Sequence, residues 1–192
     1  MSEPVAAPQA VRRGPLEGHA LPNNARVKAV ALPFAMRWIL RGGAVVAEPV
    51  GAAFGVTPPS APLRAESAGS RAALWLGPDE WLLIAEDEEP QLASALEAAL
   101  ADVPHALVDV SHRQCAIDVS GAAAARLLNS GVPLDFDLAA FPVGMVARTL
   151  LLKAEIVLWR RDAERFRLET ARSFAPYVAG VLAASARDQE LS

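Results

Sequence analysis

The fold is indicated most clearly by one stretch of sequence, VDVSHRQCAIDVSGAAAARLLNSG, which covers residues 108–131. Apolar and polar residues alternate on both sides of Ser111-His112-Arg113, a pattern typical of two short strands. The second half is rich in alanine and leucine and ends at Gly131, as helices often do. We therefore predict strands over 107–110 and 114–119, followed by a helix with Ser120 as its N-cap.

The order of two strands and a helix recurs on both sides of this stretch, although no exact internal repeat is visible. Residues 72–76 and 81–84 are apolar, and the turn over 77–80 predicts a hairpin. Pro90 and the leucines at helical spacing over 92–100 then predict a helix. Residues 146–152, 156–160 and 165–170 predict a three-stranded meander, and a last helix is expected after Ser173 as N-cap.

The last strand of the meander carries charge on every second residue. Arg165, Arg167 and Glu169 alternate with less polar neighbours, which predicts one solvated and one buried face. Strand pairs separated by helices, with hairpins in place of repeated crossovers, indicate an α+β fold with helices packed on a mostly antiparallel sheet.

Outside this region the sequence is less structured. Residues 1–24 are rich in proline and lack a hydrophobic period, so we expect a flexible arm. Residues 25–187 are expected to form a single domain, and 188–192 a short tail. If the arm has a function, the half over 15–24 is the part that we expect to contact a partner.

Composition limits the class of protein. The chain has 192 residues, of which 53% are hydrophobic, and its mean hydropathy is +0.24. Excess apolar surface is explained either by a partner interface or by an alanine-rich composition. A net charge of −4 with dispersed basic residues disfavours nucleic acid as a partner.

The amino terminus and the single cysteine bear on location. No apolar leader opens the sequence, no run approaches the roughly 20 apolar residues of a membrane span, and Cys115 has no second cysteine to pair with. We expect a cytoplasmic protein without a membrane partner.

Candidate chemistry is sparse. Asp109, Ser111 and His112 are the residue types of an acyl-transfer triad, but alternation along a strand places His112 on the opposite face. The histidines lack metal-ligand spacing, and no glycine-rich phosphate motif is present. We therefore expect neither a catalytic residue nor a metal ligand in this chain.

Two further groups admit two interpretations. The tryptophans at 38, 75, 81 and 159 could stack on a cofactor ring, but we favour a place in the core or at an interface. The acidic run over 86–89 could bind a cation, but we favour a solvated helix start.

A family resemblance is carried by residues 108–131 together with Phe141-Pro142-Val143-Gly144, Arg148-Thr149 and 171–177. Over about residues 70–187 the chain resembles the gamma subunit of heterotetrameric sarcosine oxidase, and more distantly it is similar to the folate-binding fold of the glycine-cleavage aminomethyltransferase. This resemblance implies a two-lobed aminomethyltransferase-like domain and a non-catalytic subunit with alpha, beta and delta partners. The assembly would convert sarcosine to glycine with formation of hydrogen peroxide and 5,10-methylenetetrahydrofolate. FAD, FMN, NAD, zinc and tetrahydrofolate would be bound by the other subunits.

The folate-using relatives also suggest one site residue. Their paired acids align with Ala154-Glu155 here, so one acid is missing and Glu155 remains as a weak candidate for folate contact. The main alternative is a stand-alone folate-binding aminomethyltransferase-like protein. A structural module for another flavoprotein dehydrogenase is a third possibility.

Overall fold

The computed structural model describes residues 13–87 and 89–190 and contains two antiparallel five-stranded sheets. The first sheet has, in spatial order, β1 (Lys28–Ala31), β7 (Gln114–Ser120), β10 (Arg165–Ala171), β9 (Ala154–Asp162) and β8 (Val146–Leu151). The second has β3 (Ala65–Ala68), β4 (Arg71–Gly77), β5 (Glu80–Ala85), β2 (Met36–Gly42) and β6 (His105–Asp109). The expected hairpin and the expected meander are both confirmed.

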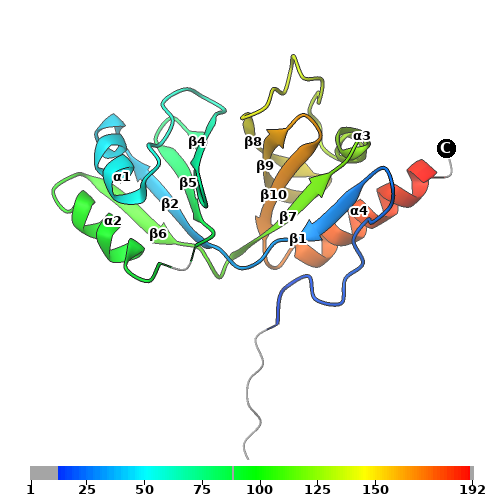
Figure 1. Cartoon of the computed structure of the whole chain (residues 1–192), viewed down its shortest axis with the longest axis horizontal. Helices are drawn as coiled ribbons and strands as arrows, with labels where there is room; N and C mark the ends of the chain where they lie inside the picture. The colour runs from blue at the N-terminus through cyan, green and yellow to red at the C-terminus, as the bar shows by residue number, and fades with distance from the viewer. Residues whose placement is uncertain (1–12, 88, 191–192) are drawn as a thin grey trace, which may run out of the picture.

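Helices cover the outer face of each sheet, and the inner faces meet (Figure 1). A short 3-10 turn (Ala44–Val46), α1 (Ala47–Phe54) and α2 (Leu92–Leu100) belong to the second sheet, while α3 (Ala124–Asn129) and α4 (Ala175–Glu190) belong to the first. The α+β fold expected from the sequence is therefore confirmed, with a helix layer, two sheet layers and a second helix layer.

The two lobes repeat one order of elements. A strand, a helix, three strands and a second helix run from β2 to α2, and the same order runs from β7 to α4. Each sheet is completed at one edge by a strand from outside that order, β6 beside β2 and β1 beside β7. The chain passes between the sheets over 32–35 and again over 110–113, so the predicted strands on either side of Ser111 belong to different sheets.

Three apolar clusters hold these layers together. One packs the first sheet on α3 and α4, and includes Phe166 and Leu182. Another packs the second sheet on α1 and α2, and includes Phe54 and Leu96. The third lies between the sheets, where Leu74, Ile84 and Trp159 are among its members, so the lobes share a core.

The predicted N-cap at Ser120 is wrong. Ser120 is the last residue of β7 and pairs with Lys28 and Arg165, whereas α3 begins at Ala124. Between them Gly121 has a φ of +115°, and a Cβ there would lie 2.4 Å from the backbone oxygen of Arg26. Only glycine fits this turn without displacing backbone.

The predicted solvated face of β10 is also wrong. Arg167 and Glu169 are 2% and 1% exposed. Their face of the strand looks toward the other sheet, and each charge is buried with an ionic partner. The alternation of charged and apolar residues correctly indicated that β10 has two different faces. The face that was expected to be solvated is covered by the other sheet.

The expected arm and tail differ from the structure. Residues 13–24 lie against the domain, because Leu16 is 7% exposed within the core of the first sheet and Leu21 packs on it. The part of the arm over 1–12 lies outside the described residues. At the other end, α4 continues through Glu190, so most of the expected tail is helical.

Candidate functional site

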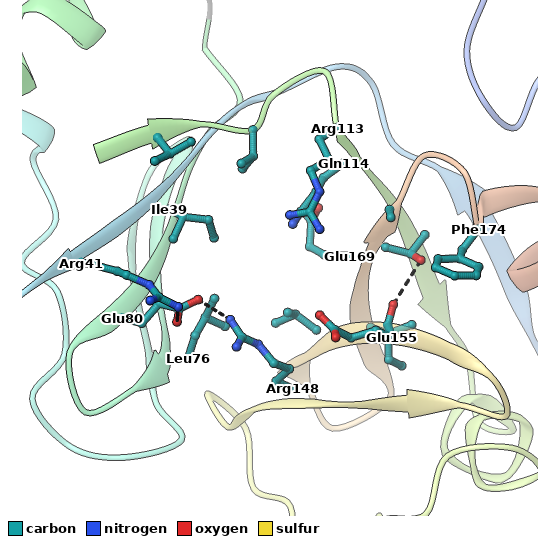
Figure 2. Close-up of a pocket in the computed structure, with 16 residues that line it drawn as sticks. Ile39, Arg41, Leu76, Glu80, Arg113, Gln114, Arg148, Glu155, Glu169 and Phe174 are labelled. Atoms are coloured by element: carbon teal, nitrogen blue, oxygen red, sulfur yellow. Dashed lines mark hydrogen bonds and ion pairs between the residues drawn. The ribbon is translucent and has the colours of Figure 1, made fainter. Parts of the chain in front are cut away.

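The interlobe pocket is a cavity of about 350 Å³ between the two sheets. Residues from β2, β4, β5 and β6 face residues from β7, β8, β9 and β10 across it (Figure 2). Its lining consists of Ile39, Arg41, Leu76, Glu80, Val108, Val110, Arg113, Gln114, Arg148, Glu155, Ile156, Val157, Glu169, Thr170, Ala171 and Phe174. This size falls within the usual range of small-molecule sites.

A buried ion-pair network lies at the inner end of the pocket and joins the lobes. Arg37 of β2 donates from Nε to Glu169 Oε2 at 2.7 Å, and Arg167 donates from Nε to Glu169 Oε1 at 2.7 Å. Arg167 also donates to Glu86, the residue that follows β5. Burial alone would lower the pKa of Arg167, but the charge and hydrogen bonds of Glu169, followed by those of Glu86, outweigh it and raise the pKa. Both carboxylate oxygens of Glu169 are therefore already bonded to the guanidinium groups of Arg37 and Arg167.

A second network lies at the rim. Glu80 of β5 accepts hydrogen bonds from Arg41 of β2, at 2.7 Å, and from Arg148 of β8 in the facing sheet. Burial tends to raise the pKa of Glu80, but the hydrogen bond and charge of Arg148, followed by those of Arg41, lower it overall. Figure 2 shows the Arg148 side chain reaching across to Glu80.

Two charged lining residues have no ionic partner within residues 13–87 and 89–190. Arg113 and Glu155 are both exposed, and neither side chain forms a salt bridge there. The oxygen Oε1 of Gln114 is buried and likewise lacks a described hydrogen-bond partner. Figure 2 shows Arg113 and Gln114 on one side of the pocket and Glu155 on the other. The pocket thus offers a guanidinium, a carboxylate and an amide oxygen to a ligand.

The lining has no serine, cysteine, histidine or lysine. Its one hydroxyl, on Thr170, donates to the backbone oxygen of Glu155 at 3.4 Å. Covalent catalysis needs a nucleophile within reach of a base. The arrangement in this pocket can bind a polar molecule, but it does not assemble such a pair.

The structure separates the residues that resembled a triad. Ser111 Oγ accepts the backbone N–H of Arg37 at 2.9 Å, and the Ser111 N–H donates to Asp109 Oδ1 at 2.7 Å. His112 points elsewhere and stacks on Phe34, with 5.2 Å between ring centroids. These residues shape the chain where it crosses between the sheets.

The cysteine lies close to this crossing. Cys115 is half-buried, and burial, followed by the charge of Glu169, raises the pKa of its thiol to about 11. A thiol with so high a pKa is almost entirely protonated at neutral pH and is a poor nucleophile.

The tryptophans are core residues, as favoured from the sequence. Trp38, Trp75 and Trp81 belong to or pack on the core of the second sheet, and Trp159 belongs to the core between the sheets. Trp81 donates from Nε1 to the backbone oxygen of Pro59 at 2.8 Å.

Glu86 and Glu89 of the acidic run are exposed, as we favoured, but the run does not start the helix, and position 88 lies outside the described residues. Asp87 and Glu89 bind Arg71, Glu86 binds Arg167, and α2 begins only at Leu92. Within the described residues no cluster of His, Cys, Asp and Glu could hold a metal ion.

Glu155 is placed in the pocket by the structure, but the other polar residues there were missed from the sequence. Arg113 and Gln114 lie in the quoted stretch, and Arg148 in a predicted strand. Polar and charged side chains of this kind are typical of exposed strand and turn positions, so no local signal distinguishes them. The pairing of two distant sheets is what brings them together.

Comparison of the sequence with known proteins identifies one family. The model of the sarcosine oxidase, gamma subunit family matches residues 42–187. A sarcosine oxidase subunit gamma of Corynebacterium sp. strain P-1 is 35% identical over 136 residues, which are 71% of this chain and 65% of that protein. The same subunit of strain U-96 is 36% identical over 106 residues, which are 55% of this chain and 51% of that protein. The chain thus spans less than two thirds of the length of these curated relatives.

Two solved structures share the fold. A chain of the heterotetrameric sarcosine oxidase from Corynebacterium sp. U-96, in complex with pyrrole 2-carboxylate, superposes with a TM-score of 0.83 and 28% identity, over 92% of this chain and 95% of that chain. The glycine cleavage system aminomethyltransferase T from Bartonella henselae superposes with a TM-score of 0.63 and 11% identity, over 82% of this chain and 45% of that one. The second likeness shows the aminomethyltransferase-like fold only. In the described part of the chain, every helix is too short or too polar to cross a membrane.

Proposed function

Because the chain belongs to the sarcosine oxidase gamma subunit family, we propose that it serves as the gamma subunit of a heterotetrameric sarcosine oxidase. The observation that carries this proposal is the family match over 42–187, together with a structural match along 92% of the chain to a protein of that assembly. Under this proposal the alpha, beta and delta subunits are its partners, and the location is the cytoplasm.

The assembly would oxidise sarcosine to glycine, with formation of hydrogen peroxide and, when folate is present, of 5,10-methylenetetrahydrofolate. FAD, FMN, NAD, zinc and tetrahydrofolate would be carried by the other subunits. A non-catalytic role for this chain is supported by the interlobe pocket, whose lining offers no nucleophile next to a base and whose buried Glu169 is already paired with Arg37 and Arg167.

The role of this chain would then be structural. Its two lobes are tied together by a shared apolar core and by ion pairs at both ends of the pocket. Such a rigid two-lobed body can present one fixed surface to a partner at little entropic cost on binding.

The purified chain alone provides the test. We expect no flavin absorption band and no sarcosine-dependent peroxide formation. Stoichiometric flavin on the lone chain, or turnover by it, would overturn the proposal that its role is non-catalytic.

A second candidate is a stand-alone folate-binding protein. It is favoured by one observation, the Glu155 carboxylate that lines the pocket and has no ionic partner in the described residues. Calorimetric titration of the lone chain with tetrahydrofolate separates the two candidates. Binding that is lost in Glu155→Gln and kept in the exposed control Glu97→Gln would favour the second candidate.

A further inference from the structure

A second cavity, the crossover pocket, lies where the chain passes twice between the sheets. Figure 1 shows the two connections running side by side below the lobes. The Val110 N–H donates to the oxygen of Arg37 at 2.9 Å, which ties one connection to the start of β2. The cavity has a volume of about 290 Å³ and is lined by Arg13, Gly14, Pro15, Leu32, Pro33, Phe34, Arg37, Ser111, Gln114, Cys115 and Arg172.

The charged residues that line this pocket are all basic. Its lining has three arginines and no aspartate or glutamate. Arg37 is neutralised by Glu169, but Arg13 and Arg172 are exposed, and neither forms a salt bridge within the described ranges 13–87 and 89–190. Arg172 Nη2 donates to the backbone oxygen of Arg13 at 2.9 Å, which holds its guanidinium near the mouth. A carboxylate at the mouth would therefore gain charge-assisted hydrogen bonds that this chain does not already supply.

One buried acceptor in the lining of the crossover pocket has no hydrogen-bond donor. Gln114 lines this pocket as well as the interlobe pocket, and its Oε1 is buried without a described partner. A buried acceptor without a donor destabilises the folded chain, because the hydration that it has lost is not replaced. The nearby Ser111 hydroxyl cannot serve, because it is already bonded to the backbone of Arg37.

An exposed aromatic side chain lines the pocket beside its arginines. Phe34 is 45% exposed and lies against His112, with 5.2 Å between the ring centroids. Aromatic residues and arginine are both enriched at protein interfaces.

We propose that the crossover pocket is a docking site for a partner subunit, and that the docked segment presents an aspartate or glutamate beside an apolar residue. The acidic side chain would bind Arg172 and Arg13, a donor of the same segment would reach Gln114, and the apolar neighbour would pack on Phe34. A polypeptide is favoured over a small anion because the lining combines the two exposed arginines with the exposed ring of Phe34, which a small anion would leave uncovered. This inference rests on the proposed function, since it identifies the surface by which the subunit joins its partners.

Photo-cross-linking tests the place and the chemistry together. The chain would carry p-benzoylphenylalanine at position 34 and be co-expressed with the alpha, beta and delta subunits of sarcosine oxidase. We expect a covalent adduct with one partner subunit, and a cross-linked peptide that contains an aspartate or glutamate next to an apolar residue. Position 45 is the matched control, because Val45 is 64% exposed and lies in the 3-10 turn that belongs to the second sheet. Assembly without an adduct from position 34, or an adduct whose peptide lacks an acidic residue, would overturn the inference.

Charge reversal tests the electrostatic part. We expect Arg172→Glu to weaken association with the partner subunits by at least tenfold and to reduce the dependence of association on salt. Arg172→Lys keeps the charge and should stay within a few fold of wild type, as should Arg187→Glu, which reverses an exposed arginine at the end of α4. Circular dichroism of each variant checks its folding, and if Arg172→Glu does not fold, the cross-linking result decides.

The outcomes separate the two proposals. Failure of the wild-type chain to join the sarcosine oxidase subunits would contradict the proposed function itself. Wild-type assembly with an unaffected Arg172→Glu variant would overturn only the docking site. Benzoate binding that Arg172→Glu abolishes, with assembly unchanged, would assign the pocket to a small carboxylate and would also overturn the inference.

Discussion

At the scale of single residues, the lobes are joined by charges that are almost completely buried. Glu169 is 1% exposed and is the shared partner of Arg37 and Arg167, which are equally buried. Removing one member of a buried ionic group is strongly destabilising, because the remaining charges lose their compensation in a medium of low dielectric constant. Glu169 is therefore the residue on which the contact between the lobes depends most.

The first prediction concerns this carboxylate. We expect Glu169→Gln to lower the free energy of unfolding by about 3–5 kcal/mol, since it leaves the buried guanidinium of Arg37 without its anion and Arg167 with Glu86 alone. Urea denaturation followed by tryptophan fluorescence measures the change. Glu97→Gln alters an exposed glutamate of α2 and should change the unfolding free energy by less than about 0.5 kcal/mol. Equal effects of the two substitutions would show that the buried network contributes nothing.

The second prediction concerns pH. The pKa of Glu80 is lowered in the folded chain, so the unfolded chain binds the proton more tightly. Its contribution to stability is therefore present above the ordinary pKa of a glutamate and is lost as the pH falls through the lower, folded pKa. We expect wild type to be more stable than Glu80→Gln at pH 7, and the difference to shrink between about pH 5 and pH 3. Thermal unfolding at a series of pH values tests this, and a gap that widens on acidification would contradict it.

At the scale of elements, local signals predicted the strands well and the partners of those strands poorly. The hairpin of β4 and β5 and the meander of β8, β9 and β10 could be predicted because their strands are neighbours in sequence and are joined by short turns. By contrast, β6 and β7 look like a hairpin but lie in different sheets. The same packing of distant strands buries Arg167 and Glu169 of β10. Their alternation with apolar residues had predicted that this face of the strand is exposed to solvent. Register between distant strands has no local signature, so neither the shared core nor the polar lining of the interlobe pocket could be predicted.

The third prediction compares two glycines in different elements. In Gly121→Ala the new Cβ would meet the backbone oxygen of Arg26 at 2.4 Å, at a φ of +115°, so the turn from β7 to α3 must shift. We expect a loss of at least about 1–3 kcal/mol, the usual cost of such strain. Gly180→Ala, in α4, meets no atom within 4 Å and should stabilise the chain by about 0.5–1 kcal/mol through helix propensity. Differential scanning calorimetry measures both variants, and we expect Gly180→Ala to melt at a higher temperature than Gly121→Ala. A higher melting temperature for Gly121→Ala would contradict this explanation.

At the scale of the whole molecule, two similar lobes exchange edge strands and share a core. The segment over 13–27 leads into β1, which completes the first sheet beside β7. It also brings Leu16 into that core and Arg13 to the crossover pocket. The amino-terminal segment therefore contributes both to the stability of the domain and to the surface that we assign to the partner.

The fourth prediction compares two deletions from the amino terminus, one that ends before Arg13 and one that continues through Asn24. Removing residues 1–12 should leave both the melting temperature and the pull-down of partner subunits almost unchanged. Removing residues through Asn24 should weaken both, because it removes buried Leu16 and the Arg13 side of the pocket. Leu16→Ala in the full chain keeps Arg13 and serves as the control, since it should lower stability by about 2–5 kcal/mol while leaving assembly of the folded chain intact. Full-strength assembly after the longer deletion would show that residues 13–24 are not an interaction element.

We propose that this chain is a structural subunit of a sarcosine oxidase. Native mass spectrometry of the chain co-expressed with the alpha, beta and delta subunits tests it most directly. We predict a heterotetramer that contains one copy of this chain, carries flavin and forms peroxide from sarcosine. A flavin-bearing, active assembly that excludes this chain, while the chain remains monomeric in the same sample, would contradict the account.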